Sequence, residues 1–202
     1  MHGRLVYLAM TDSLAADAVV PRLRGRLGRP YEHVGSTPST QLLVAADARE
    51  GALVTAEEQT AGRGRLGRLW LAPAGTSLLC SLQLRPGVPQ ERLPELTGVA
   101  AHACAEAIAA LTGLEPELKF PNDLLLGGRK VAGILAEARE ERVVLGVGVN
   151  VNVPAVDLPQ EVARAATSLL VETGQELDRA ELLVELLERL ERRYDAWLSA
   201  GS

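Results

Sequence analysis

The two lysines of this chain lie in one segment, KFPNDLLLGGRKVAGILAE, which runs from Lys119 to Glu137. They are the only lysines among 21 basic residues, since all the others are arginines. A lysine carries a compact charge on a flexible stem, whereas an arginine carries a rigid planar fork that almost never loses its proton. The sequence therefore favours Lys119 and Lys130 as positions that need an ammonium group, with chance as the alternative explanation.

A second cationic segment, TAGRGRLGRLWLAPAG, carries Arg63, Arg65 and Arg68 between glycines. Guanidinium groups and backbone amides spaced in this way can fold over an anion such as a phosphate or a carboxylate. The glycines also favour mobility, so we expect a loop that is disordered without ligand and ordered over a bound one. A solvated basic turn is the alternative interpretation.

Other phosphate-binding and catalytic patterns are not supported. Gly62, Gly64 and Gly67 match G-x-G-x-x-G, but a dinucleotide-binding loop opens a helix, whereas here Trp70 and an alternating strand follow. GGRKVAG lacks the spacing and the hydroxyl of a P-loop. The three histidines and two cysteines share no spacing with a nucleophile, a carboxylate or a metal-ligand motif.

Three glycines are expected to leave space against a sheet. In the strand predicted over 142–153, Gly146, Gly148 and Asn150 fall on one face, because side chains alternate along a strand. Two missing side chains make room for a flat ligand against the backbone, and Gly133 in the neighbouring strand enlarges the gap. A β-bulge or tight strand packing explains these glycines equally well.

Several polar residues lie close to these segments in the sequence. Asn122 and Asp123 are interpreted in one of two ways. They are simple turn formers, or they hold a metal or orient an amine beside the lysines and the arginine loop. Ser36, Thr37 and Gln59 would, taken alone, be capping or solvated residues. Two lysines, several arginines and one aspartate suit charge stabilisation in phosphoryl or nucleotidyl transfer better than acid–base hydrolysis.

The elements that must position these residues have an α+β pattern. The spacing predicts strands over 31–34, 52–57, 76–84, 117–120, 124–126, 130–138 and 142–153, and helices over 12–23, 40–48, 92–111, 160–172 and 178–198. Alternation over 76–84 predicts a half-buried strand at a sheet edge. Asp178 with Glu181 predicts a capping box, and the leucines that follow form a packing stripe. Because hairpins join several strands, the sheet should be mixed and largely antiparallel, with helices packed on it.

Length and charge restrict the class of protein. With 202 residues, the chain is long enough for one domain with a substantial core, and we expect an N-terminal extension with one short helix over 1–30 and the main domain over 31–202. A net charge of −5 argues against a general nucleic-acid binder. There is no apolar run of membrane-spanning length and no convincing export signal, so we expect a cytoplasmic protein. Cys80 and Cys104 are interpreted as buried thiols in a reducing compartment.

Three segments in this order, EEQTAGRGRLGRLWLAPAG, KFPNDLLLGGRKVAGILAE and GVGVNV, resemble the signature blocks of biotin protein ligases, the biotin–[acetyl-CoA-carboxylase] ligases. The upstream GSTPST resembles the Ser-Thr-Asn turn of that family, and the resemblance covers about residues 31–197. It implies the catalytic fold of biotin and lipoate ligases, which is like that of class II aminoacyl-tRNA synthetases.

The resemblance also implies a reaction and its partners. ATP, with Mg²⁺, would convert biotin into biotinyl-5′-AMP and pyrophosphate, and a lysine of the biotin carboxyl carrier protein would then accept the biotinyl group. No nucleic acid or membrane is expected as a partner. A homodimer joined through sheet edges is a further hypothesis.

Site roles follow from the same resemblance. Lys130 should bridge the biotin carboxylate and the α-phosphate. The expected catalytic residues are Lys130, Arg63, Arg65 and Asp123, with Asp123 also as a Mg²⁺ ligand. The expected biotin-binding residues are Ser36, Thr37, Pro38, Gln59, Arg63, Gly64, Arg65, Lys130, Gly133, Gly146 and Gly148. The expected ATP- or adenylate-binding residues are Arg63, Arg65, Arg68, Trp70, Lys119, Asn122 and Asn150.

Three departures from the family pattern matter. Pro38 stands for the usual Asn and removes an amide and a backbone donor, so one hydrogen bond to biotin is open to question. Phe120 stands for the commoner Trp. Family members usually continue beyond the position of Ser202 into a small SH3-like domain, so we expect that domain to be missing here, with a cost in ATP affinity and turnover. We also expect no DNA-binding winged helix upstream.

Two other functions compete with biotin ligation. A lipoate or octanoate ligase or transferase shares the fold and also acylates a lysine. A biotin- or adenylate-binding protein without transfer activity is the second alternative, because of the short C-terminus.

Overall fold

A seven-stranded mixed sheet organises the protein. The computed structural model describes residues 12–158 and 166–200. The sheet has the order β1-β2-β5-β9-β8-β7-β6, and its ladders are antiparallel except that β1 runs parallel to β2. Its strands are β1 (Tyr31–Thr37), β2 (Leu53–Gln59), β5 (Ser77–Leu84), β6 (Glu117–Lys119), β7 (Asp123–Leu126), β8 (Arg129–Arg139) and β9 (Arg142–Asn150). The prediction of an α+β fold with a largely antiparallel sheet is confirmed.

The helices and a second, two-stranded sheet complete the described fold. The α-helices are α1 (Ala16–Val19), α2 (Thr40–Leu43), α3 (Glu95–Thr112), α5 (Leu169–Thr173) and α6 (Arg179–Ser199). The small sheet pairs β3 (Gly62–Arg63) with β4 (Leu69–Trp70). Short 3-10 turns are η1 (Val20–Arg22), η2 (Arg65–Gly67), η3 (Gln90–Arg92) and η4 (Ala155–Asp157).

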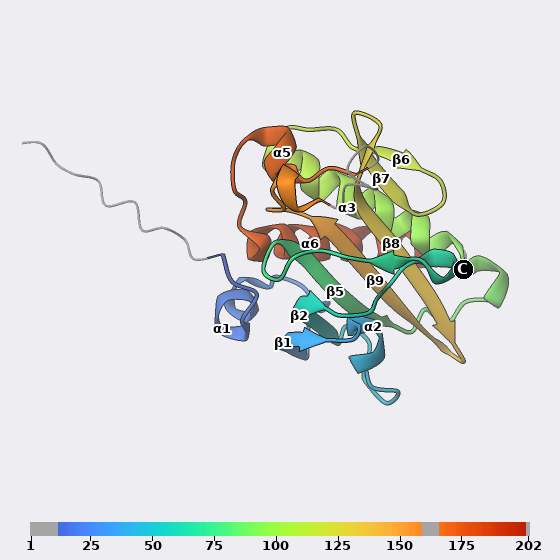
Figure 1. Cartoon of the computed structure of the whole chain (residues 1–202). Helices are drawn as coiled ribbons and strands as arrows, with labels where there is room; N and C mark the ends of the chain where they lie inside the picture. Colours follow the sequence, from blue (N-terminus) through green and yellow to red (C-terminus); the bar gives the residue numbers. More distant parts are fainter. Residues whose placement is uncertain (1–11, 159–165, 201–202) are drawn as a thin grey trace, which may run out of the picture.

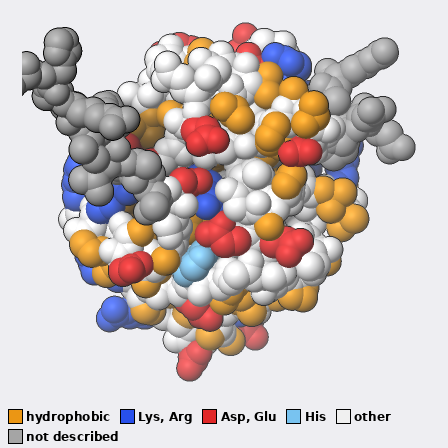
Figure 2. Space-filling model, turned by 60° about the vertical axis from the view of Figure 1, so that its left-hand side comes forward, with side chains coloured by type: hydrophobic (Ala, Val, Ile, Leu, Met, Phe, Trp, Pro, Cys, Tyr) orange, Lys and Arg blue, Asp and Glu red, His pale blue; other side chains and the backbone are white. Residues whose placement is uncertain are grey.

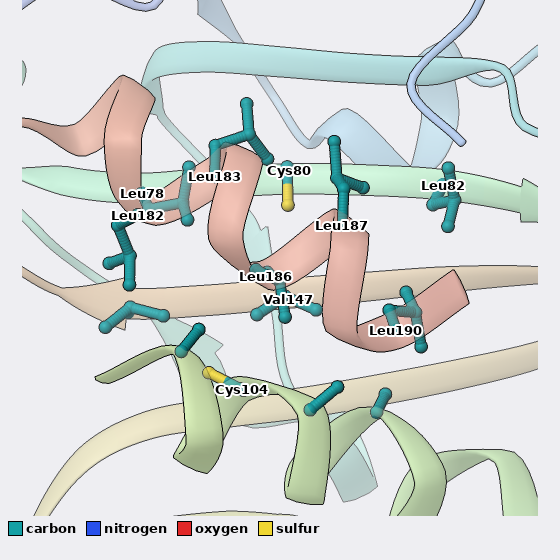
Figure 3. Close-up of a cluster of buried hydrophobic side chains, with 14 of the residues drawn as sticks. Leu78, Cys80, Leu82, Cys104, Val147, Leu182, Leu183, Leu186, Leu187 and Leu190 are labelled. Carbon is teal, nitrogen blue, oxygen red and sulfur yellow. The ribbon is translucent and has the colours of Figure 1, made fainter. Parts of the chain in front are cut away.

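Helices α3 and α6 cover one face of the sheet, and the segment that carries β3 and β4 crosses the other (Figure 1). The core lies between the sheet and these helices. The predicted leucine stripe of α6 points into it, opposite Cys80 and Val147 of the sheet and Cys104 of α3 (Figure 3). The faces of β8 and β9 that point away from α3 and α6 are therefore left for the site.

Strand β5 differs from its prediction as a half-buried edge strand. It lies inside the sheet between β2 and β9, and all eight of its residues are buried. The polar face is covered by α2, where the hydroxyls of Thr40 and Ser81 lie 2.7 Å apart. The strand itself is confirmed, but its polar face packs against other polar groups and does not face water.

Two predicted helices are shorter in the structure. The helix predicted over 40–48 ends at Leu43, because Val44 turns to an extended backbone and packs against Val54 and Val144. The helix predicted over 12–23 is only α1 followed by the 3-10 turn η1, since Pro21 has no N–H to continue an α-helix.

The helix predicted over 160–172 falls partly outside the described residues, and its described part is helical only from Leu169. Residues 159–165 lie outside the described part of the chain, and Thr167 and Ser168 are not helical. Helix α5 begins at Leu169, where the Ser168 hydroxyl accepts a hydrogen bond of 3.1 Å from the Val171 N–H. The predicted strand over 142–153 likewise ends at Asn150, and β1 continues through Ser36 and Thr37.

The N-terminal residues share the core of the main domain. Four leucines and valines before Pro30 are buried in the same cluster as α6, namely Leu14, Val19, Leu23 and Leu27. The guanidinium of Arg179 at the start of α6 joins this region to the sheet, because it donates to Asp12 at 2.7 Å and to Glu57 of β2 at 2.7 Å. Arg179 is itself 2% exposed.

The surface in Figure 2 carries acidic and basic side chains among scattered hydrophobic ones. Within the described ranges, no helix combines the length and the apolar character that a membrane crossing requires.

Candidate active site

A cavity of about 600 Å³ opens on the face of the sheet opposite α3 and α6. Its floor is β8 and β9, where Gly133 pairs directly with Gly148. Its walls come from α2, the β3–β4 segment and the turn between β6 and β7. The cavity therefore brings together elements that are far apart in the sequence.

Most predicted site residues line this one cavity. They are Gln59, Arg63, Gly64, Arg65, Arg68, Trp70, Lys119, Asn122, Asp123, Lys130, Gly133, Gly146, Gly148 and Asn150. Ser36, Thr37 and Pro38 are not among its lining residues.

Lys130 is held at the cavity by the β7–β8 hairpin. The hairpin turn is Gly127-Gly128, and both glycines have positive φ, of 55° and 77°, as a tight two-residue turn requires. The Nζ of Lys130 lies 2.7 Å from Oδ1 of Asp123 and 5.4 Å from the centre of the Trp70 ring. The ammonium is thus oriented by a carboxylate and an aromatic face while its side chain remains one-third exposed.

The space predicted over the glycines holds the Trp70 ring in this structure. A Cβ added to Gly148 would lie 2.8 Å from Cε2 of Trp70, and one added to Gly133 would lie 3.0 Å from Cζ3. A Cβ on Gly146 would instead lie 3.1 Å from Nε2 of Gln41. The space over these glycines is thus occupied by the flat side chains of Trp70 and Gln41, and a flat ligand at this place stays a prediction.

The arginine loop forms a small hairpin over the sheet. Gly62 pairs with Trp70 and Arg63 with Leu69, and the Gly64 N–H donates to the Arg68 carbonyl at 2.7 Å. Arg63 reaches across to Glu137 of β8 at 3.4 Å. The loop therefore lies over β8 and β9 with its guanidiniums at the cavity, whereas its predicted ordering by a ligand stays a prediction.

Polar side chains from α2, β2 and β5 form the buried part of the cavity. The Gln59 side-chain oxygen accepts from both the N–H and the hydroxyl of Thr40, at 2.8 and 3.0 Å. Gln41 donates to the Leu135 carbonyl at 3.2 Å. Within the described residues, Oγ of Ser39 and Oε1 of Gln41 are buried and have no hydrogen-bond partner. Such groups are costly unless a ligand satisfies them.

The second Ser-Thr pair, not the first, lies at the cavity. Ser36 is exposed at the end of β1 and donates to Glu58 at 3.0 Å, and Thr37 is buried away from the cavity. Ser39, Thr40 and Gln41 line it instead. The sequence does not single them out, because the segment contains Ser-Thr twice. The available signal is the amide side chain of Gln41, which follows only the second pair.

Asn150 and Cys80 have supporting positions in the cavity wall. The Asn150 amide donates to the Thr167 carbonyl at 2.9 Å and so fixes the chain before α5. Cys80 is a buried free thiol, and burial raises its pKa to about 12, so it stays protonated at neutral pH.

The side chains described around the cavity do not include a cluster of metal ligands. In the part of the chain that the structure describes, no three His, Cys, Asp or Glu side chains gather where a metal ion could bind. Asp123 is a single carboxylate and is already paired with Lys130.

The fold and the cavity define the class of protein: a mixed sheet with one cavity that combines buried, unpartnered polar atoms with cationic side chains. Residues 34–153 match the model of the Biotin/lipoate A/B protein ligase family. The chain belongs to this family.

Individual relatives agree with that assignment. The chain is 41% identical over 174 residues to a bifunctional ligase/repressor BirA of Bacillus spizizenii, and the match covers 83% of this chain and 54% of the relative. It thus spans about half the length of that relative. A biotin–[acetyl-CoA-carboxylase] ligase of Mycobacterium tuberculosis is 41% identical, with 86% of this chain and 67% of that protein covered.

A solved structure of the family has the same fold. The biotin protein ligase from Aquifex aeolicus, in complex with biotin and ATP, superposes with a TM-score of 0.78 at 32% identity. The match covers 84% of this chain and 72% of the Aquifex chain.

Proposed function

We propose that this protein activates biotin with ATP to biotinyl-5′-AMP and transfers the biotinyl group to a lysine of a biotin carboxyl carrier protein. The observation that carries the proposal is the pairing of buried, unpartnered polar atoms with a cationic mouth in one cavity. The names of the relatives, and the biotin and ATP bound to the Aquifex protein, support the same reaction.

Buried polar atoms favour biotin over lipoate in this proposal. The ureido ring of biotin offers two N–H donors and a carbonyl acceptor, which can satisfy Oγ of Ser39 and Oε1 of Gln41. The dithiolane ring of lipoate offers no comparable donor and would leave these atoms unpaired. Sites built to hydrogen-bond a ligand reject analogues that lack the partner group. Ser39, Thr40 and Gln41 therefore take the biotin-binding role first assigned to Ser36, Thr37 and Pro38.

In the first step, two anions must approach each other. The biotin carboxylate oxygen attacks the α-phosphorus of ATP, a P–O bond forms, and the bond to pyrophosphate breaks. Lys130, with Arg63 and Arg65, lowers the repulsion between the carboxylate and the triphosphate and stabilises the charge of the transition state. Mg²⁺ takes part as a component of the MgATP substrate, bound mainly through phosphate oxygens.

In the second step, the amine of the acceptor lysine attacks the acyl carbon of the adenylate. A C–N bond forms, the C–O bond to AMP breaks, and the amine loses a proton. Asp123 lies at the mouth beside Lys130, and in the proposal it orients the incoming amine. Trp70, Lys119 and Asn122 hold the adenylate side. In this proposal the reaction takes place in the cytoplasm.

The test of the proposal is pyrophosphate exchange into ATP, measured separately with biotin and with lipoate. We expect exchange that depends on biotin and is at least about 10³-fold slower with lipoate, the discrimination that unpaired buried polar groups can give. Equal exchange with lipoate would favour the lipoate ligase alternative. Tight biotin binding with no exchange would favour a binding protein without transfer activity.

A further inference from the structure

The mouth of the cavity carries an unusual share of the exposed hydrophobic side chains. Seven large hydrophobic residues are exposed in the described part of the chain, and four of them line the cavity. These four are Leu66, Leu69, Leu71 and Phe120, which are 82%, 65%, 57% and 87% exposed. Hereafter these four residues are called the apolar rim.

The apolar rim comes from two separate segments on either side of the site. Three leucines belong to the loop and strand around β4, which crosses over β8 and β9 (Figure 1). Phe120 follows directly after β6, in the turn that leads to β7. Large exposed apolar groups from two segments that line one opening are the arrangement expected of an interaction patch.

Cations surround the apolar rim. Arg65, Arg68 and Lys119 are exposed beside it, and none of them forms an ion pair within residues 12–158 and 166–200. The whole chain has a net charge of −5, so this positive mouth differs from the rest of the molecule. It therefore favours a partner whose surface is acidic.

We propose that the apolar rim is the docking surface for the acceptor protein, and that this protein presents an apolar patch with acidic neighbours around its acceptor lysine. The proposal rests on the proposed function. An acceptor amine that enters the cavity through this mouth brings the protein surface around its lysine against the apolar rim. Phe120 is 87% exposed and does not belong to the arginine loop, whose ordering over a ligand is predicted.

The test compares a protein acceptor with a small one. Phe120→Ser and Leu71→Ser, singly and together, are assayed with a recombinant biotin carboxyl carrier domain and with hydroxylamine, a small nucleophile that traps the adenylate as a hydroxamate. Each substitution should raise the KM for the carrier domain by about fivefold to tenfold, as expected for truncation of a buried interface side chain. Because both residues line the cavity, hydroxamate formation is measured for each variant, and the rise in the KM for the carrier domain should exceed any change in the hydroxamate rate.

Val156→Ser is the matched control. Val156 is 88% exposed and is not among the residues that line the cavity. It should leave the KM for the carrier domain unchanged. The proposal is wrong if the rim variants keep the original KM, or if Val156→Ser raises it as much as they do.

Direct binding separates this proposal from the proposed function. Equilibrium binding of the same carrier domain, without ATP, should weaken in the rim variants by the same factor as the KM rises. This holds even if the protein proves unable to activate biotin. A change of oligomeric state in the rim variants with unaltered carrier binding would show that a second copy of the chain covers the rim, and would overturn the proposal.

Discussion

At the scale of single residues, two cationic side chains of the site already have carboxylate partners in the structure. Lys130 is oriented by Asp123 and faces the Trp70 ring. Arg63 forms an ion pair with Glu137, which lies on β8 as Lys130 does. An anionic substrate must compete with these carboxylates, and the cations need not be gathered when it binds. Preorganisation of this kind is the largest common source of transition-state stabilisation.

Replacement of Lys130 with alanine tests the central charge. We expect Lys130→Ala to lower the rate of biotin-dependent pyrophosphate exchange by about 10²- to 10³-fold, the cost of losing one preorganised charge-stabilising group. Circular dichroism and the thermal midpoint should remain close to the original, because the side chain is partly exposed. Turnover like that of the original protein would show that the role of Lys130 is misplaced.

Replacement of Gly148 with alanine tests the floor of the cavity. A Cβ there would lie 2.8 Å from the Trp70 ring, which has to shift. Overpacking of this kind costs ~1–3 kcal/mol, so we expect biotin to bind about tenfold more weakly in calorimetry. Gly35→Ala in β1 is the control, since no atom lies within 4 Å of its added Cβ. If both variants bind biotin equally well, the glycine floor has no role in binding.

Alkylation measures the state of the buried thiols. Burial raises the pKa of Cys80 and of Cys104 to about 12, so both remain protonated at mildly alkaline pH, and only the thiolate is a nucleophile. Mass spectrometry after iodoacetamide treatment should find neither cysteine alkylated in the native protein and both alkylated in guanidinium. Rapid alkylation of Cys80 without denaturant would contradict this.

The sequence predicted much of the site because rare residue types mark it. The scarcity of lysine indicated Lys130, the glycine-spaced arginines indicated the loop, and strand alternation placed Gly146 and Gly148 on one face. The sequence could not show which Ser-Thr pair lines the buried part of the cavity, because GSTPST contains two such pairs. Only the length of β1, which continues through Thr37, decides between them.

At the scale of elements, the sequence predicted a helix end well where a local capping residue determines it. It predicted a helix end poorly where long-range packing determines it. The last helix was expected over 178–198 and is Arg179–Ser199, with the Asp178 carboxylate accepting from the N–H groups of Ala180 and Glu181. Helix α2 is short because Val44 packs in a small cluster with residues distant in sequence. A local pattern does not contain that contact.

Loss of the Asp178 cap should destabilise α6. We expect Asp178→Ala to lower the free energy of unfolding by about 1–2 kcal/mol, because two helix N–H groups lose their acceptor and Arg22 loses its ion-pair partner. Only the Asp178 half of the predicted capping box forms, because the Glu181 carboxylate makes no hydrogen bond in the described structure. Glu181→Ala, an exposed change in the same turn, should therefore cost less than about 0.5 kcal/mol. Urea denaturation of the two variants measures the difference, and equal costs would argue against the cap.

At the scale of the whole molecule, a buried arginine joins parts that the sequence alone does not connect. Arg179 contacts Asp12 near the N-terminus and Glu57 in β2, while residues 14–27 contribute to the same core as α6. Periodicity could predict the α+β class and most strands, but not these long-range pairs. It could not predict the interior position of β5 either, because polar faces can be buried against each other.

Removal of that arginine should weaken the entire fold. We expect Arg179→Ala to cost about 2–4 kcal/mol of unfolding free energy, below the full range for a buried ion pair because Asp12 and Glu57 are about a quarter exposed. Arg24→Ala breaks an exposed pair with Glu188 and should cost less than about 1 kcal/mol. Similar midpoints in thermal unfolding for the two variants would contradict a structural role for Arg179.

The most direct test of the account as a whole is mass spectrometry of a biotin carboxyl carrier domain after incubation with this protein, ATP, Mg²⁺ and an equal mixture of biotin and lipoate. We expect a mass gain of one biotinyl group on a single lysine, with adenylate detected in parallel and no lipoyl product. A lipoylated carrier, or an unmodified carrier with no adenylate, would contradict it.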